Sequence, residues 1–159
     1  MEDLLRQEAR VIVRPAEEKD FQRMLEFGQD FFEFNPYKES SCLDGEHLEN
    51  TFRFLAAGGI LLVAETDSVV VGMIGAVIAP TYWNYNDLQG LETFLWVDPS
   101  ARGSSAAKDL KKACVEQARE QGVKFWHMVA LETSRPDAVG KSYTQDGYTL
   151  VEHGYMKVL

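Results

Sequence analysis

The strand–turn–helix stretch "LWVDPSARGSSAAKDL" constrains the fold of this chain more than any other part of the sequence. An apolar run ends at Asp98-Pro99, and an amphipathic helical pattern begins after Gly103 and closes at Gly122. A second apolar run, "VKFWHMVAL", follows this helix. Strand, helix and strand in this order favour a parallel pair of strands joined by a right-handed crossover. We therefore expect residues 91–131 to form the centre of a sheet covered by helices.

The rest of the chain alternates between strand-like and helix-like patterns. A short β-branched run stops at Pro15, and apolar residues then recur every three or four positions, as on one face of a helix. A second helical pattern spans residues 45–59, and two apolar runs joined by Asp67-Ser68 indicate a hairpin. A short helix is expected in "SRPDAVGKSYTQDGY", and one or two final strands in "TLVEHGYMKVL". The predicted fold is mixed α/β, with six to seven strands and about four helices on both faces of the sheet.

The length and charge of the chain limit what it can be. Its 159 residues fit one domain of usual size, 1–159. The net charge of −9 argues against nucleic acid as a partner, because phosphate-backbone binders carry a basic face. A negative field attracts a cationic partner such as an amine. The alternative is that the acidity serves only solubility.

Cysteine usage and hydropathy indicate the compartment. The two cysteines, Cys42 and Cys114, lie far apart and suggest neither a disulfide framework nor a metal site. The N-terminal "MEDLLRQEAR" lacks the apolar core of a signal peptide, and the longest apolar run, 69–79, is too short to span a membrane. A cytoplasmic location is expected, with no metal and no membrane partner.

The order of elements and the arginine–glycine turn resemble the GCN5-related N-acetyltransferase (GNAT) superfamily over about residues 11–159. The family pattern at this turn is Arg/Gln-x-x-Gly-x-Gly/Ala. Arg102 matches its first position and Ala107 its last, and Gly103 matches the glycine that commonly follows the arginine. Ser105 stands where the family usually has glycine. The resemblance implies a twisted, mostly antiparallel sheet.

The resemblance also implies acetyl-CoA as the co-substrate. In the family, this turn wraps the pyrophosphate with backbone N–H groups, and the helix N-terminus behind it adds partial positive charge. A backbone amide on the preceding strand would donate to the thioester oxygen. The expected cofactor-binding residues are Leu95, Trp96, Val97, Arg102, Gly103, Ser104, Ser105, Ala106 and Ala107.

Two residues are candidates for proton transfer. Glu92 is a glutamate in an apolar strand, where partial burial would raise its pKa toward neutrality and suit it as a general base. The alternative is a solvent-facing glutamate on an alternating strand. Tyr143 precedes Gly147-Tyr148 with the spacing found in the family, which implies a general acid for the departing thiolate. The alternative is a packed aromatic residue.

Two aromatic segments are candidates for the acceptor site, which we expect between the first two helices and the connection before the fourth strand. Carboxylates there would pair with an ammonium group, and aromatic rings would add cation–π attraction. The alternative is that these rings form a small satellite core. The candidate residues are Asp30, Phe31, Phe34, Tyr82 and Trp83.

The function implied by the resemblance is an N-acetyltransferase, in which a primary amine attacks acetyl-CoA directly. One alternative is a binding or structural protein that keeps this fold with little or no turnover. Ser105, and Pro136 where the family often has asparagine, favour that alternative. Another alternative is that the acceptor is a protein lysine or N-terminus rather than a small amine. Many relatives are homodimers, and the final strands are the candidate contact.

Overall fold

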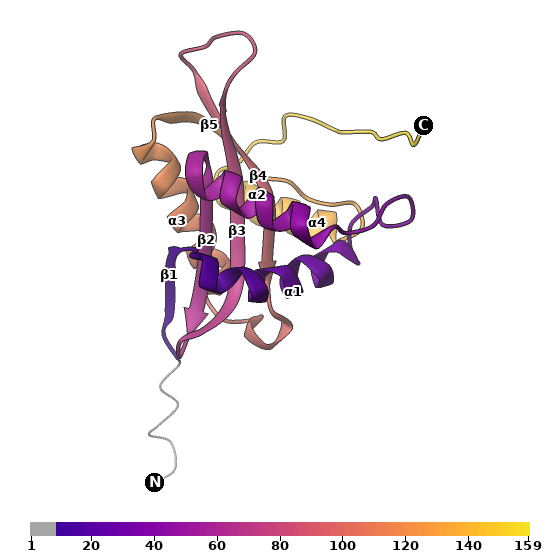
Figure 1. The fold of residues 1–159 in the computed structure, drawn as a ribbon. Helices are drawn as coiled ribbons and strands as arrows, with labels where there is room; N and C mark the ends of the chain where they lie inside the picture. Colours follow the sequence, from indigo (N-terminus) through magenta and orange to yellow (C-terminus); the bar gives the residue numbers. More distant parts are fainter. Residues whose placement is uncertain (1–8) are drawn as a thin grey trace.

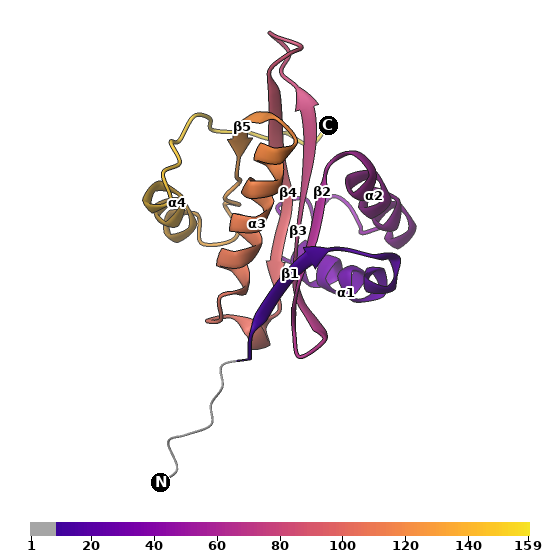
Figure 2. The same cartoon turned by 90° about the vertical axis from the view of Figure 1, so that its left-hand side faces the viewer.

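The computed structural model describes residues 9–159 and contains one five-stranded sheet with helices on both faces (Figures 1 and 2). The strands are β1 (Val11–Pro15), β2 (Ile60–Thr66), β3 (Val69–Pro80), β4 (Leu88–Val97) and β5 (Val123–His127). The helices are α1 (Phe21–Phe32), α2 (Gly45–Gly58), α3 (Ala106–Glu120) and α4 (Pro136–Gln145). Two short 3-10 helices, η1 (Glu18–Asp20) and η2 (Pro99–Ala101), precede α1 and α3.

The strands lie in sequence order across the sheet, β1-β2-β3-β4-β5. The pairs β1–β2, β2–β3 and β3–β4 are antiparallel, and the pair β4–β5 is parallel. The parallel strand–helix–strand unit expected around α3 is therefore confirmed. The expected hairpin is also present, and its turn residues Asp67 and Ser68 both have the positive φ angles of a tight hairpin turn, 50° and 65°.

The strand count differs from the expected six to seven. Five strands are present within residues 9–159, and "TLVEHGYMKVL" forms none of them. A strand needs a neighbour to satisfy its backbone groups, and after Gly147 this segment extends away from the sheet (Figure 1). Its apolar side chains are exposed, at 74% for Leu150 and 69% for Val151. The strand expected over 123–131 also ends early, at His127, because residues 128–131 leave the sheet.

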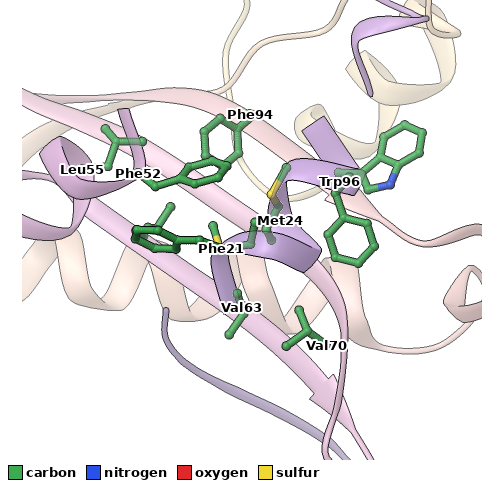
Figure 3. Close-up of a cluster of buried hydrophobic side chains, with 11 residues drawn as sticks. Phe21, Met24, Phe52, Leu55, Val63, Val70, Phe94 and Trp96 are labelled. Atoms are coloured by element: carbon green, nitrogen blue, oxygen red, sulfur yellow. The ribbon is translucent and has the colours of Figure 1, made fainter. Parts of the chain in front are cut away.

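The apolar side chains form one cluster on each face of the sheet. Helices α1 and α2 cover one face, and α3 and α4 lie on the other (Figure 2). Figure 3 shows the first cluster, in which the aromatic rings of Phe21 and Phe52 from these helices lie beside Phe94 of β4, while Trp96 of the same strand lies at the other end of the cluster. The second cluster packs the apolar side of α3, including Leu110 and Cys114, against the sheet, and these side chains are fully buried. The periodic apolar residues of each helix thus account for the layered fold.

A bulge in β4 decides which way Glu92 points. Gly75 of β3 pairs with Phe94, but the next residue, Ala76, pairs with Glu92, so Thr93 is the extra residue. Phe94 belongs to the cluster under α1 and α2, whereas Ala76 belongs to the cluster under α3. Strict alternation would place Glu92 with Phe94. The bulge turns Glu92 to the α3 face instead.

Candidate active site

The two parallel strands separate halfway along β4. Strand β5 pairs only with residues 88–91, and the last of these pairs joins Leu91 to His127. From Glu92 to Val97, β4 is bonded to β3 on one side, and no strand of the described chain pairs with its other side. We call residues 92–97 of this side the open edge. Leu95, Trp96 and Val97, predicted to bind the cofactor, lie on it.

The predicted turn follows directly from the end of the open edge. The carboxylate of Asp98 caps η2 by accepting a hydrogen bond from Ser100 N at 2.9 Å. Gly103 then takes a φ of +91°, in the left-handed region that glycine tolerates. Within residues 9–159, the amides of Gly103, Ser105 and Ala107 have no hydrogen-bond partner. These amides, at the N-terminus of α3, make the turn suited to binding an anion.

The polar side chains of the turn bind the protein itself. Arg102 folds back, with its Nε donating to Val97 O at 3.3 Å and its guanidinium carbon 4.9 Å from the centre of the Trp96 ring. Ser105 Oγ hydrogen-bonds Asp109 Oδ2 at 2.7 Å. The anion-binding capacity of the turn therefore lies in its backbone amides. Asp109 is stabilised by the helix N-terminus but adds negative charge beside them.

Glu92 lies where the open edge begins. Its Oε2 accepts a hydrogen bond from Val129 N at 3.2 Å. The side chain keeps partial solvent contact, but the surrounding apolar atoms disfavour its charge and raise its pKa to about 7, while the Val129 bond works in the opposite direction. A carboxyl group with this pKa exchanges protons near neutral pH, as a general base requires.

Tyr143 reaches the same point from α4. Its Oη donates to Val129 O at 2.9 Å, so the backbone of Val129 connects Glu92 to Tyr143. The pKa of Tyr143 is raised by burial and by the negative charge of Glu92, and the hydroxyl therefore stays protonated. The structure thus brings the two proton-transfer candidates together around one residue that the sequence analysis did not select. Val129 acts through its backbone, which leaves no motif in the sequence.

The thiol of Cys114 also lies on this face. It is fully buried on the apolar side of α3, and burial together with the charge of Glu92 raises its pKa to about 12. Such a thiol stays protonated at neutral pH and is a poor nucleophile.

The acceptor-site candidates lie in two separate places. Phe31 and Phe34, at the end of α1, have ring centroids 5.9 and 5.7 Å from that of Trp96, beside the open edge, and Asp30 is exposed on the same helix. Tyr82 and Trp83 lie in the β3–β4 connection, beyond the pairing of Pro80 with Leu88. Strand β3 ends at Pro80, four residues or about 13 Å along the strand from the partner of Glu92, and the connection begins after it.

Thr133 is a further contact that the sequence analysis missed. Its hydroxyl donates to the carbonyl oxygen of Phe34, and so connects the segment after β5 to the end of α1. Threonine in a polar, proline-containing stretch reads as an ordinary turn residue. No sequence signal distinguished it.

A surface hollow of about 660 Å³ lies away from these groups and is lined by charged residues of β1, η1 and β2. Its charges are already satisfied by one another. Arg14 donates to Asp20 at 2.8 and 2.9 Å and to Glu65 at 3.0 Å, and its bonds to Asp20 lower the pKa of that carboxyl group. This arrangement holds η1 against the sheet rather than offering a binding site.

In the described part of the chain, no three His, Cys, Asp or Glu residues are grouped so as to hold a metal ion. No helix there is long and apolar enough to cross a membrane.

The geometry defines a class of α/β protein. A parallel strand pair opens midway, and the freed strand leads into a turn lined by backbone amides at a helix N-terminus. This arrangement suits an extended ligand that ends in an anionic group.

Comparison with known proteins agrees with this class. The model of the acetyltransferase (GNAT) family matches residues 21–140, more than half of the chain. The chain therefore belongs to this family. A search of curated proteins found no significant match.

Solved structures share the fold at low sequence identity. A transcriptional regulator from Bacillus halodurans C-125 is 20% identical, with a TM-score of 0.76, over 94% of this chain and 100% of that chain. A predicted acetyltransferase from Clostridium acetobutylicum, solved with acetyl-CoA, is 18% identical, with a TM-score of 0.71, over 94% and 96%. An aminoglycoside acetyltransferase from an uncultured soil metagenomic sample, solved with sisomicin, is 18% identical, with a TM-score of 0.67, over 94% and 97%.

Proposed function

We propose that this protein transfers an acetyl group from acetyl-CoA to a primary amine by direct attack of the amine. The observation that carries the proposal is the position of Glu92. Its carboxyl group, with a pKa of about 7, begins the open edge, and the other end of the open edge leads to the amides of residues 103–107. One continuous stretch of chain thus offers a base at one end and an anion site at the other.

Acetyl-CoA would be held by backbone groups. The amides of Gly103, Ser105 and Ala107 suit its pyrophosphate, and the open edge at Leu95–Val97 offers backbone donors and acceptors to its extended arm. A family relationship and a neighbouring fold solved with acetyl-CoA support this choice of acyl donor.

Glu92 and Tyr143 would move the protons. The carboxylate of Glu92 takes a proton from the acceptor ammonium, directly or through water, and so produces the neutral amine. The amine nitrogen bonds to the thioester carbonyl carbon, and the carbon–sulfur bond breaks. Tyr143, which is protonated at neutral pH, gives its proton to the departing thiolate, and the surplus proton on the newly acylated nitrogen, passed on directly or through water, restores the Tyr143 hydroxyl. No nucleophile from the protein is needed.

The body of the amine acceptor would bind near the end of α1, on the face of the sheet that α1 and α2 cover, and its amino group would reach past the open edge to Glu92 on the α3 face. Phe31 and Phe34 gather beside Trp96, and Asp30 adds negative charge nearby. One fold neighbour is an aminoglycoside acetyltransferase by name, and aminoglycosides are amines, which supports a small-molecule acceptor. A protein lysine or N-terminus is the second acceptor class, and a panel of both kinds separates them.

A second candidate function is acyl-CoA or CoA binding without turnover. It is favoured by the hydrogen bonds of Glu92 and Tyr143 to the backbone of Val129, which occupy both groups that would move protons. In that case Glu92→Gln and Tyr143→Phe would change no measured rate.

The experiment that tests the proposal combines binding and turnover. Titration calorimetry with acetyl-CoA and with CoA is run on the wild type and on Arg102→Glu, whose added negative charge opposes an anion at the turn. Thiol release is then followed with acetyl-CoA and a panel of amines. Glu116→Gln, an exposed glutamate on α3, is the matched control for Glu92→Gln. Binding with Glu92-dependent thiol release supports the transferase. Binding without thiol release supports the second candidate, and no binding by the wild type contradicts both.

A further inference from the structure

Residues 128–134, which we call the strap, run beside the open edge of β4. Two hydrogen bonds of the Val129 backbone hold the start of the strap. Tyr143 Oη donates to Val129 O at 2.9 Å, and Val129 N donates to Glu92 Oε2 at 3.2 Å. Near its end, the hydroxyl of Thr133 donates to Phe34 O. The Phe34 ring lies 5.7 Å from that of Trp96. The strap therefore passes from the Glu92 end of the open edge to the Trp96 end.

This arrangement occupies the groups that the proposed reaction needs. The carboxylate of Glu92 and the hydroxyl of Tyr143 both bind the Val129 backbone rather than a substrate. The indole nitrogen of Trp96 is buried, and within residues 9–159 it has no hydrogen-bond partner. A buried donor without a partner is unfavourable, and it gains one when water or a ligand reaches it.

The backbone just after the strap is strained. Arg135, the N-cap residue of α4, has φ 50° and ψ 56°, which is the left-handed region that a residue with a Cβ atom adopts at a cost. The strap thus ends at a position that gains from a change of backbone conformation. Thr133 and Arg135 are exposed, so neither is fixed by core packing.

We propose that Thr133 is a positioning residue, which fastens the strap along the open edge, and that acetyl-CoA binds there only after the strap has moved away. This inference rests on the proposed function. In the closed arrangement the strap keeps Glu92 and Tyr143 engaged. When the Thr133–Phe34 bond breaks, the strap leaves, and both side chains and the open edge become accessible together.

The first test measures opening without any ligand. Thr133→Val removes the hydroxyl and keeps the shape of the side chain, whereas Thr133→Ser keeps the hydroxyl. Hydrogen exchange of the strap amides, followed by mass spectrometry, should be roughly threefold to tenfold faster in Thr133→Val, as expected for the loss of one hydrogen bond. Thr133→Ser should match the wild type. Equal exchange in the two variants would overturn the assignment of Thr133.

The second test measures access by CoA, with the association rate constant followed by tryptophan fluorescence in stopped flow. If the open form is the minor form that binds, the association rate of Thr133→Val rises by the same factor as its exchange, and Thr133→Ser keeps the wild-type rate. Faster exchange with an unchanged association rate would show that the strap does not limit access and would overturn that part of the inference. Absence of CoA binding in all variants would instead overturn the proposed function, together with the gating of CoA.

Discussion

The carboxyl groups of Glu92 and Asp20 show how strongly neighbouring atoms decide the chemistry of a single residue. Asp20 is buried, and Glu92 keeps only partial solvent contact. Arg14 donates two hydrogen bonds to Asp20 and lowers its pKa, so Asp20 is a permanent anion that holds η1 in place. Glu92 has no cation bonded to it among residues 9–159, and its pKa rises to about 7. Of these two carboxyl groups, Glu92 is therefore the one that exchanges a proton near neutral pH.

Replacing Glu92 should remove the general base. We expect Glu92→Gln to lower kcat/KM by about 100-fold or more, the usual contribution of general base catalysis. Wild-type kcat/KM should fall as the pH drops through about 7, because protonation of Glu92 removes the active carboxylate. The measurement is a pH–rate profile with acetyl-CoA and an amine found active in the panel. If Glu92→Gln keeps the wild-type rate, and that rate still falls as the pH drops through about 7, another residue is the general base.

The raised pKa of Glu92 also predicts how the stability of the protein depends on pH. The folded state holds a proton on Glu92 up to about pH 7, whereas the unfolded chain releases it near the ordinary glutamate pKa of 4.5. Stability is therefore lost as the pH rises from 4.5 to 7, by an amount on the order of 3 kcal/mol. Urea unfolding should show Glu92→Gln more stable than the wild type at pH 8 and nearly equal to it at pH 4. Glu116→Gln should show no such difference between the two pH values.

At the scale of single elements, the turn before α3 and the helix α4 use glycine in opposite ways. Gly103 has a φ of +91°, whereas Gly140 lies inside α4 with helical geometry. A Cβ atom at either position would meet no atom within 4 Å. Substitution by alanine therefore tests backbone conformation alone at both sites.

These two glycines make a matched pair of substitutions. Gly103→Ala should destabilise the protein by about 1 kcal/mol or more, because alanine is strained at positive φ, and should weaken CoA binding by displacing the amides of the turn. Gly140→Ala should stabilise it by roughly 0.5–1 kcal/mol, because alanine favours the helix. Thermal unfolding and calorimetry with CoA measure both effects. The same sign of stability change in both variants would contradict the backbone argument.

The sequence predicted the elements that have a local pattern. It did not predict the features that depend on pairing between distant segments of the chain. The crossover through α3 followed from an apolar run, a turn and an amphipathic stretch. The bulge at Thr93 depends on the register of β3 against β4, and no local pattern reveals it. The strap was missed because Val129 bonds through its backbone, and the apolar run 123–131 gave no sign that β5 ends at His127. Glu92, Tyr143 and the turn were selected from sequence, but the contact that Glu92 and Tyr143 share with Val129 required the fold.

At the scale of the whole molecule, helices cover both faces of the sheet (Figure 2), whereas the C-terminal segment 149–159 is exposed. Helices α1 and α2 shield one apolar cluster, and α3 shields the other (Figure 2). The C-terminal segment 149–159 leaves the body with its apolar side chains exposed (Figure 1). Strand β5 pairs with β4 on one side, and within the part of the chain that the structure describes it has no strand on its other side. An open sheet edge and an exposed apolar segment are the two halves of a strand-pairing contact.

This pairing predicts that the protein associates with itself through its C-terminal segment. We expect sedimentation velocity to show a dimer that forms as the concentration rises, because exposed side chains such as Leu150, Val151 and Tyr155 lose contact with water when the segment pairs with β5 of a second copy. A chain that ends at residue 149 should remain monomeric at every concentration. The double variant Val151→Lys/Tyr155→Lys keeps the full length and should also be monomeric, since charge opposes burial of the segment. If the full chain and both variants sediment alike, the segment does not mediate association, and the exposed edge of β5 must be protected by its own polar residues.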